Sequence, residues 1–249
     1  FVQPSVNLRA AMAHQYQEPI HVGSPVVVDS AGIGGIFWTG DDAVDAASNA
    51  SVSDVKILKG TYGGFTMDHA DMIVRGSGWD TVIDGTTLKH GVSISAKKVG
   101  LFDLTVRTTP SGGQAHDGVY GGAADSVRVE NVNCSGSDQD CFNFGGTAVH
   151  IVNVQAIDPD RDCVRKGGDY GLIANSRCHA AGNDGLMIGN GSGGMDNNVF
   201  TGNAVKDCSG NSMQINAGSE SALYNICSGN RLDGAINGSC TDGNNTTAY

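Results

Sequence analysis

The sequence predicts an all-β protein in which short strands wind into a parallel β-solenoid. Three observations lead to this fold class: a repeat of about 22 residues, short β-branched segments within each repeat, and 37 glycines among 249 residues. That glycine content is about twice the usual ~7%. Because each glycine inside a helix costs about 1 kcal/mol, a helical bundle is disfavoured. The glycines follow no three-residue period, so collagen is excluded as well.

The repeat consists of two series of similar segments that alternate along the chain. The first series begins at residues spaced by 27, 23, 22, 22 and 28 positions, which are His90, Asp117, Asp140, Asp162, Asp184 and Ser212. In the second series, Asn131, Asn153 and Asn175 are again 22 residues apart. A unit of this length with two β segments and no helical pattern is one coil of a solenoid. Equivalent residues of neighbouring coils then stack at ~4.8 Å.

Alternation inside the first series indicates which side chains face the core. Apolar residues recur two positions apart in successive coils. We therefore expect four pairs to point inward, namely Val92/Ile94, Phe142/Phe144, Leu186/Ile188 and Met213/Ile215. The residues between them should face outward, namely Ser93, Asn143, Met187 and Gln214.

The chain divides into three predicted segments. Residues 1–40 do not follow the repeat and are expected to form an N-terminal arm for packing or oligomer contact. Residues 41–240 are expected to form the parallel β-helix domain, and residues 241–249 a loose C-terminal tail. The segment 41–49 is expected to form a short helix that caps the open end of the solenoid and protects its first strand edge.

Charge and hydropathy exclude several classes of function. The net charge is −11, with 15 Lys and Arg against 26 Asp and Glu. No basic face could neutralise a run of phosphates, so a nucleic-acid partner is excluded. No apolar stretch approaches the ~20 residues of a membrane-spanning helix. The acidic, lysine-poor balance favours a saline or extracellular setting.

The segment from Asp41 to Gly85 and the coils that follow resemble the right-handed parallel β-helix superfamily. The likeness rests on that segment, on coils of the form D-[GC]-Φ-x-Φ (Φ, apolar) and on V-x-N-V-x-C. The superfamily contains pectin and pectate lyases, polygalacturonases and phage tailspikes. The resemblance implies a right-handed, single-stranded solenoid that recognises polysaccharides outside the cell or on a virion surface. The resemblance to tailspikes implies that this protein forms a homo-oligomer, taken as a trimer. Alternatively, it implies that the protein binds virion or fibre partners through residues 1–40.

The predicted catalytic carboxylates lie in a column that holds one aspartate per coil, Asp117, Asp140, Asp162 and Asp184. Stacking puts the carboxylates of neighbouring coils ~5 Å apart, which is the separation in retaining glycosidases. Carboxylates of alternate coils are ~10 Å apart, which is close to the separation in inverting glycosidases. We predict Asp140 and Asp162 as the catalytic pair, because close carboxylates raise one pKa toward that of a general acid. The alternative is structural, since an Asp at the entry to each strand can accept backbone N–H groups of a repeated turn.

Residues beside the catalytic pair are predicted to bind the substrate. Two coils carry the tandem motif D-x-D-C, which adds Asp138, Asp160 and Arg161 to the predicted substrate site. The sequence requires no cofactor. The one metal that these aspartates would suit is calcium, at Asp138, Asp140, Asp160 and Asp162, because Ca²⁺ prefers oxygen ligands.

Arg165 and Lys166 follow Asp162 on the same predicted strand and complete the predicted catalytic set for a lyase. Arg165, at an outward position, would remove the proton next to a uronate carboxyl group. Lys166 falls at an inward position, where burial would lower its pKa. The alternative for Lys166 is that the strand ends there and the amine reaches outward to pair with the aspartates.

His116 and Tyr120 are the remaining predicted substrate-binding residues. His116 precedes Asp117 and would supply an acid or base, while Tyr120 projects outward as a platform for sugar stacking. The alternative for His116 and Asp117 is a solvated hydrogen bond at a turn.

The seven cysteines are expected to stack in columns rather than to form a disulfide framework. Cys141 and Cys163 occupy one column of consecutive coils, where a bridge would fit the ~5 Å separation. Cys134 and Cys178 occupy another column, with Ala156 between them. One further bridge is conceivable near the end, among Cys208, Cys227 and Cys240.

Two functions follow from these patterns. The first is a polysaccharide-recognising β-helix, tailspike-like or secreted, whose enzymatic form would be a lyase or glycoside hydrolase acting on acidic glycans. The second is a non-catalytic structural protein of a virion, fibre or surface. The second is favoured by an incomplete polygalacturonase motif, since Arg161 stands where a paired Asp is expected and Asp184 where a His is expected.

Overall fold

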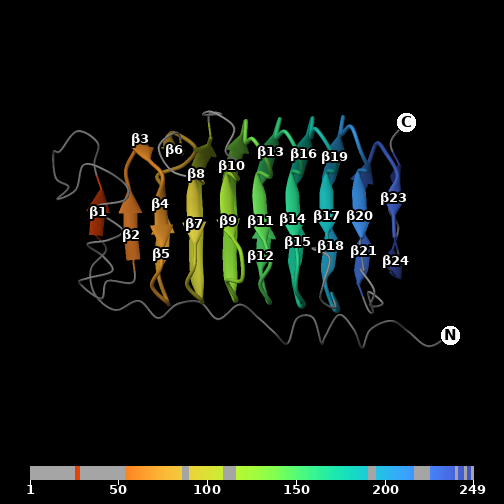
Figure 1. Ribbon diagram of the computed structural model, residues 1–249, viewed down its shortest axis with the longest axis horizontal. Coiled ribbons are helices and arrows are strands. Elements are labelled where there is room, and N and C mark those ends of the chain that lie inside the picture. Colours follow the sequence, from red (N-terminus) through yellow and green to blue (C-terminus); the bar gives the residue numbers. More distant parts are fainter. Residues whose placement is uncertain are drawn as a thin grey trace.

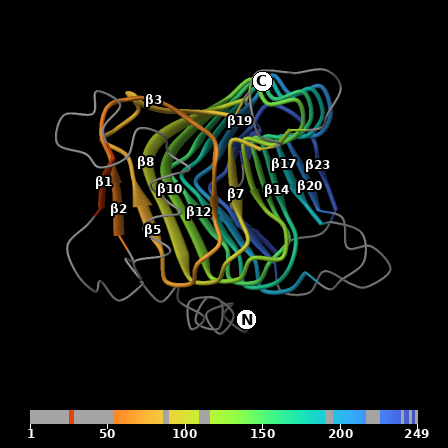
Figure 2. The ribbon, with the colours of Figure 1, turned by 60° about the vertical axis from the view of Figure 1, so that its left-hand side comes forward.

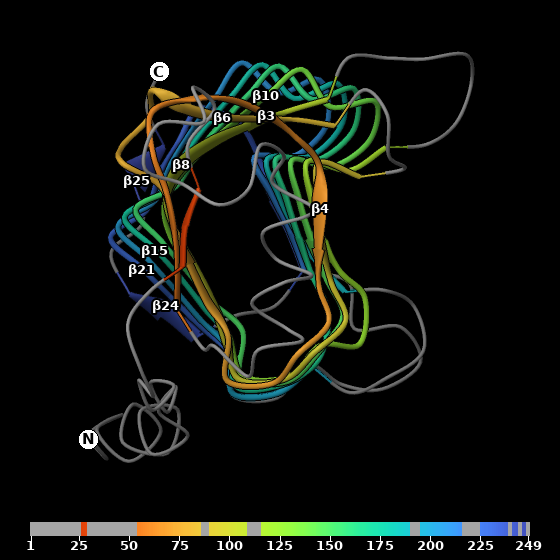
Figure 3. The same ribbon diagram turned by 90° about the vertical axis from the view of Figure 1, so that its left-hand side faces the viewer.

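The computed structural model describes residues 26–28, 54–85, 90–108, 116–189, 195–215, 225–238, 241–243 and 246–247. Every regular element in these ranges is a β-strand, and the strands pair in parallel. They wind into about seven coils, seen from the side in Figure 1 and along the axis in Figure 3. The predicted all-β solenoid is therefore confirmed.

Two sheets run along the solenoid. Sheet B contains β4 (Phe65–Met67), β7 (Val92–Ile94), β9 (Val119–Gly121), β11 (Phe142–Phe144), β14 (Val164–Lys166), β17 (Leu186–Ile188), β20 (Met213–Ile215) and β23 (Ile236–Asn237). Sheet A, which has 17 strands, lies across the core from sheet B and bends along its length into two arms (Figures 2 and 3).

The arms of sheet A are named by their place in Figure 1. The lower arm contains β1 (Val26–Val28), β2 (Asp54–Ile57), β5 (Ile73–Arg75), β12 (His150–Val152), β15 (Leu172–Ala174), β18 (Val199–Thr201), β21 (Ile226–Ser228) and β24 (Thr241–Gly243). The upper arm contains β3 (Gly60–Gly63), β6 (Thr81–Asp84), β13 (Gln155–Ile157), β16 (Arg177–His179), β19 (Ala204–Lys206), β22 (Arg231–Leu232) and β25 (Thr246–Thr247). β8 (Val99–Arg107) and β10 (Val127–Ser135) run through both arms.

The strand register confirms the repeat in the central coils. Partners in β11, β14 and β17 are 22 residues apart, as are partners in β12 and β15. Met213 pairs with Leu186, so Asn211, and not Ser212, follows Asp184 in the aspartate column. The alignment of Ser212 with that column was wrong by one residue. The coil before Ser212 is longer than the others, and the residues around Ser212 can be aligned with the repeat in two registers.

The core is filled as the alternation predicts. All four inward pairs of sheet B are buried, and Phe142 and Phe144 are among the largest fully buried side chains. The outward residues Ser93, Asn143, Met187 and Gln214 are partly exposed. Inward and outward positions therefore alternate along every strand of this sheet, and burial of the apolar ladder stabilises the stack.

The bend between the arms explains the second series of the repeat. Asn131, Asn153 and Asn175 each have a φ between 52° and 55°, in the left-handed region that asparagine tolerates. Gly202 and Gly229, in the next two coils, also have positive φ. One left-handed residue per coil turns the chain from the lower arm to the upper arm.

The ends of the solenoid differ from the segments predicted from the sequence. β1 lies inside the predicted arm and pairs with β2, while β24 and β25 lie inside the predicted tail and pair with β21 and β22. A terminal coil has only one neighbouring coil, so its sequence is less constrained by stacking and the repeat is harder to recognise. The predicted capping helix at 41–49 lies outside the described residues.

The cysteines form a disulfide that the sequence did not indicate. Cys163 is bonded to Cys178, fifteen residues later, while Cys141 is free, so the bridge considered between Cys141 and Cys163 is absent. The predicted columns are confirmed, since Cys134 pairs with Ala156 and Ala156 with Cys178. Cys227 is also disulfide-bonded. The expectation of stacking without disulfides was wrong, because the inward side of a narrow coil brings two columns within bonding distance.

Candidate functional site

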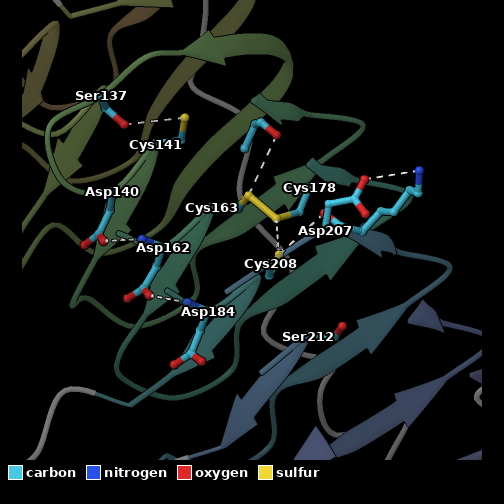
Figure 4. Close-up of a disulfide and its surroundings, with 12 residues drawn as sticks. Ser137, Asp140, Cys141, Asp162, Cys163, Cys178, Asp184, Asp207, Cys208 and Ser212 are labelled. Carbon is cyan, nitrogen blue, oxygen red and sulfur yellow. Dashed lines mark hydrogen bonds and ion pairs between the residues drawn. A yellow bond between two sulfur atoms is a disulfide. The ribbon is translucent and has the colours of Figure 1, made fainter. Parts of the chain in front are cut away.

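The aspartate column forms a continuous hydrogen-bonded ladder between coils (Figure 4). The Oδ1 atom of Asp117 accepts the backbone N–H of Asp140, at 3.0 Å. Asp140 and Asp162 repeat this bond to the next coil at 3.1 and 3.0 Å, and Asp184 accepts the N–H of Asn211 at 2.7 Å. All four aspartates are at most 2% exposed. The sequence allowed either a catalytic or a structural role for these aspartates, and the ladder of hydrogen bonds gives them the structural one.

A layer of polar side chains covers the ladder from outside. Each comes from a later coil: Arg161 bonds both carboxylate oxygens of Asp140, and Asn183 donates to Asp162 at 2.8 Å. Asn143, an outward residue of β11, donates to Asp117 at 3.1 Å. The Arg161 guanidinium thus covers Asp140, the most buried aspartate of the ladder, in place of solvent. Arg161 is also one of the residues that the sequence predicts to bind the substrate.

Burial raises the pKa of two ladder aspartates. The pKa of Asp117 is raised to about 6, chiefly by burial and then by the charge of Asp140, although hydrogen bonds from Asp140 and Asn143 oppose the shift. Burial and the charge of Asp140 also raise the pKa of Asp162. The pKa of Arg161 is raised by its hydrogen bond to Asp140. A carboxyl group with a pKa near 6 is partly protonated close to neutral pH, as a general acid must be.

The outer face of sheet B carries a strip of outward-pointing side chains above this ladder. Tyr120, Asn143, Arg165 and Met187 occupy successive strands in register. Tyr120 is 37% exposed, and its ring stacks on His90 with centroids 4.3 Å apart. Arg165 is half-buried and forms no hydrogen bond or ion pair with any described residue. We call Tyr120, Asn143 and Arg165 the sheet B strip.

Lys166 lies inside the solenoid, on the opposite side of β14 from Arg165. Its side chain is fully buried, and its ammonium donates to the backbone carbonyls of Gly146, Gly167 and Gly168. Burial lowers the pKa of Lys166 to about 7. The inward position anticipated from the alternation is observed, whereas the outward-reaching alternative is not.

His116 and Asp138 lie together next to the first turn of the ladder. Nδ1 of His116 is 3.5 Å from Oδ2 of Asp138, and both side chains are largely buried. Neither Nδ1 of His116 nor Oδ1 of Asp138 has a hydrogen-bond partner among the described residues. Buried polar atoms without partners are rare, so this pair is a candidate contact for a ligand hydroxyl group.

The predicted site residues therefore separate into groups. Arg161 contacts Asp140 and lies near Asp162, whereas Asp160 is exposed and faces solvent. Lys166 is separated from them by its own strand. Within the described ranges, no group of three His, Cys, Asp or Glu side chains has an arrangement that could hold a metal ion. Calcium binding and catalysis by Asp140 and Asp162 remain predictions.

A second surface was missed by the sequence reasoning. A hollow of about 900 Å³ lies over the upper arm and is lined from β13, β16, β19 and β22. Its two arginines, Arg177 and Arg231, are 54 positions apart and belong to no motif. The sequence signal that could have revealed them is that both arginines occupy the same position of the repeat, with one coil between their two coils.

The parallel β-helix fold is similar to that of several solved structures. Carrot pectin methylesterase aligns with a TM-score of 0.66 at 12% identity, over 92% of this chain and 84% of its own. The Agl-KA catalytic domain aligns with a TM-score of 0.63 at 17% identity, over 90% of this chain and 50% of its own. A GH87 α-1,3-glucanase catalytic domain in complex with nigerose aligns with a TM-score of 0.64 at 16% identity, over 86% of this chain and 42% of its own.

These likenesses describe the fold. The chain spans about half the length of the α-1,3-glucanase domains that it matches. No protein-family model and no curated protein matches its sequence. In the part of the chain that the structure describes, no helix could cross a membrane.

Proposed function

We propose that the protein recognises an acidic polysaccharide along the sheet B strip. The observation that carries this proposal is Arg165, a guanidinium on the outer face that has no partner among the described residues. A guanidinium binds a carboxylate through two parallel hydrogen bonds, which suits a uronate better than a neutral sugar. Tyr120 offers an exposed aromatic ring two strands away, which suits the apolar face of a sugar.

The structural neighbours support the class of ligand. A GH87 α-1,3-glucanase has been solved with tetrasaccharides, and a pectin methylesterase with a hexasaccharide. Both are carbohydrate-active proteins on a β-helix. Because identity is only 12–17%, the particular glycan for this chain is inferred from the side chains of the strip alone.

Cleavage of the bound glycan is the enzymatic form of this proposal, by a lyase or hydrolase mechanism. Asp140 would have to release Arg161 before acting, because both of its oxygens accept hydrogen bonds from the guanidinium. Asp117 has a pKa raised to about 6, as a general acid requires, so it is the stronger candidate in the ladder for donating a proton.

A non-catalytic structural role is the second candidate. It is supported by the ladder, in which all four aspartates already bond the next coil. In that case the aspartates maintain the solenoid and the protein serves as a fibre or surface module, with residues 1–40 as the proposed contact to other copies in a trimer or to a virion.

The proposed setting is extracellular or a virion surface. The Cys163–Cys178 disulfide supports it, because structural disulfides persist in oxidising compartments and are rare in the cytosol.

Binding to a panel of acidic and neutral polysaccharides tests the proposal. Isothermal titration of Arg165→Gln against oligogalacturonate should show about tenfold weaker binding than the unmodified protein, which corresponds to ~1.4 kcal/mol. The matched control is Arg128→Gln, which removes a guanidinium that is already paired with Glu130 on the lower arm. Equal binding of acidic and neutral glycans, or no effect of Arg165→Gln, would contradict the proposal.

Incubation of the same glycans with the protein separates the enzymatic from the structural form. A lyase increases both reducing ends and the absorbance of unsaturated uronate, whereas a hydrolase increases only reducing ends. Binding without either signal favours the structural form.

A further inference from the structure

The hollow on the upper arm is lined by residues of four neighbouring strands and by Asp233, which follows the last of them. β13, β16, β19 and β22 lie in order along the solenoid, and β13, β16 and β19 are seen side by side at the upper edge of Figure 1. At about 900 Å³ the hollow is within the size range of small-molecule binding sites. It therefore has room for a short segment of a linear polymer.

Two guanidiniums stand in one column of this hollow. Arg177 pairs in register with Ala204, and Ala204 pairs with Arg231. Because neighbouring coils are ~4.8 Å apart, the two arginines are about 10 Å apart along the axis. The methyl group of Ala204 between them leaves the space open. This arrangement suits two anionic groups that are separated by one uncharged position.

The positive charge of this column is not neutralised within the described residues. Neither Arg177 nor Arg231 forms an ion pair or hydrogen bond with a described residue, although both are exposed. The nearby Asp207 carboxylate is already engaged by His179 and Lys206, each at 3.1 Å.

The second nearby acid is engaged as well. Asp233 accepts hydrogen bonds from the backbone of Asp207 and from the Ser212 hydroxyl group. Both arginines are therefore available to a ligand. Their position is notable because the whole protein carries a net charge of −11.

We propose that this hollow is a second glycan-binding site, in which Arg177 and Arg231 each bind one carboxylate or sulfate of an acidic oligosaccharide. The choice of a glycan rests on the proposed function, whereas the anionic character of the ligand rests on the two arginines. A nucleic acid fits less well, because its continuous phosphates would meet the repulsion of the acidic surface around so small a basic site. The site belongs to sheet A and is separate from the sheet B strip.

The test uses the full chain and a sulfated or galacturonate hexasaccharide as the probe. Isothermal titration of the unmodified protein should resolve two sites per chain. In Arg177→Gln/Arg231→Gln, one site should weaken at least about tenfold, since the charge-assisted hydrogen bonds of both guanidiniums are lost. The site should also weaken with added salt, because exposed charges are screened over about 10 Å at 0.1 M. Arg128→Gln is the matched control.

The outcomes separate this inference from the proposed function. If Arg165→Gln leaves binding unchanged while the double variant loses it, the upper-arm site stands and the sheet B strip fails. If the double variant binds as the unmodified protein does, the upper-arm site is overturned. It is also overturned if the methyl-esterified hexasaccharide binds equally well, or if single-stranded DNA displaces the glycan at lower concentration. Circular dichroism of the double variant should be unchanged, because both arginines are exposed and form no bond with a described residue.

Discussion

The aspartate ladder and the two arginine-bearing outer faces use charge in opposite ways. In the ladder, every carboxylate is buried and bonds the backbone of the next coil. On the outer faces, Arg165, Arg177 and Arg231 have no partner among the described residues. The contrast supports two proposals, namely that the buried carboxylates of the ladder stabilise the stack and that these three arginines are available to a ligand. A side chain's exposure and existing bonds are therefore better guides to function here than its residue type.

The largest expected effect comes from breaking the ladder at its centre. Asp140→Ala removes the acceptor for the N–H of Asp162 and leaves Arg161 without its carboxylate. Loss of one partner from a buried pair costs about 3–5 kcal/mol, and we expect urea denaturation to show a decrease of that size. Asp160→Asn is the control, since Asp160 is exposed and should change stability by less than about 0.5 kcal/mol. Equal stability of the two variants would show that the ladder does not stabilise the fold.

The disulfide is the next largest contribution. Cys163→Ala/Cys178→Ala opens a loop of 15 residues, for which the chain-entropy model gives about 3 kcal/mol. The melting temperature of this variant should lie below that of the oxidised protein but not below that of the dithiothreitol-treated protein, in which the disulfide of Cys227 is reduced as well. A variant that melts with the oxidised protein would argue against a bond between these two cysteines.

The raised pKa of Asp117 has a smaller effect, which depends on pH. Its pKa is about 6 in the folded chain against an ordinary 3.8, so the folded state binds more protons between these values. Stability should therefore decrease as the pH rises from about 4 to 6, by about 2 kcal/mol from this group. Denaturation across this range should show a shallower decrease for Asp117→Asn. An identical slope in both proteins would mean that another group titrates.

The smallest effect on stability is expected at the outer faces. Arg165→Gln and Arg177→Gln/Arg231→Gln should each change the unfolding free energy by less than about 0.5 kcal/mol, because these side chains have no partners to lose. The same variants should weaken glycan binding. A large loss of stability in either one would place it with the ladder residues instead.

Much of the fold could be predicted because stacking constrains sequence and structure alike. The inward pairs, the outward positions and the Asn that recurs in three central coils all follow from a 22-residue period. The ends were harder, since β1, β24 and β25 lie in segments where the repeat is weak. Of the site, Arg161 was predicted among the residues beside the catalytic pair, whereas the sequence left open whether Lys166 lies inward or reaches outward.

The sequence by itself determined the coil, its period and the column in which each residue stands, because these depend only on spacing along the chain. The tertiary structure alone decided what each column does. It decided that the aspartates bond the next coil, that Cys163 bonds Cys178, and that Arg177 and Arg231 share one hollow. The physical reason is that hydrogen bonds, disulfides and hollows depend on distances between columns and between coils. A one-dimensional repeat contains no such distances.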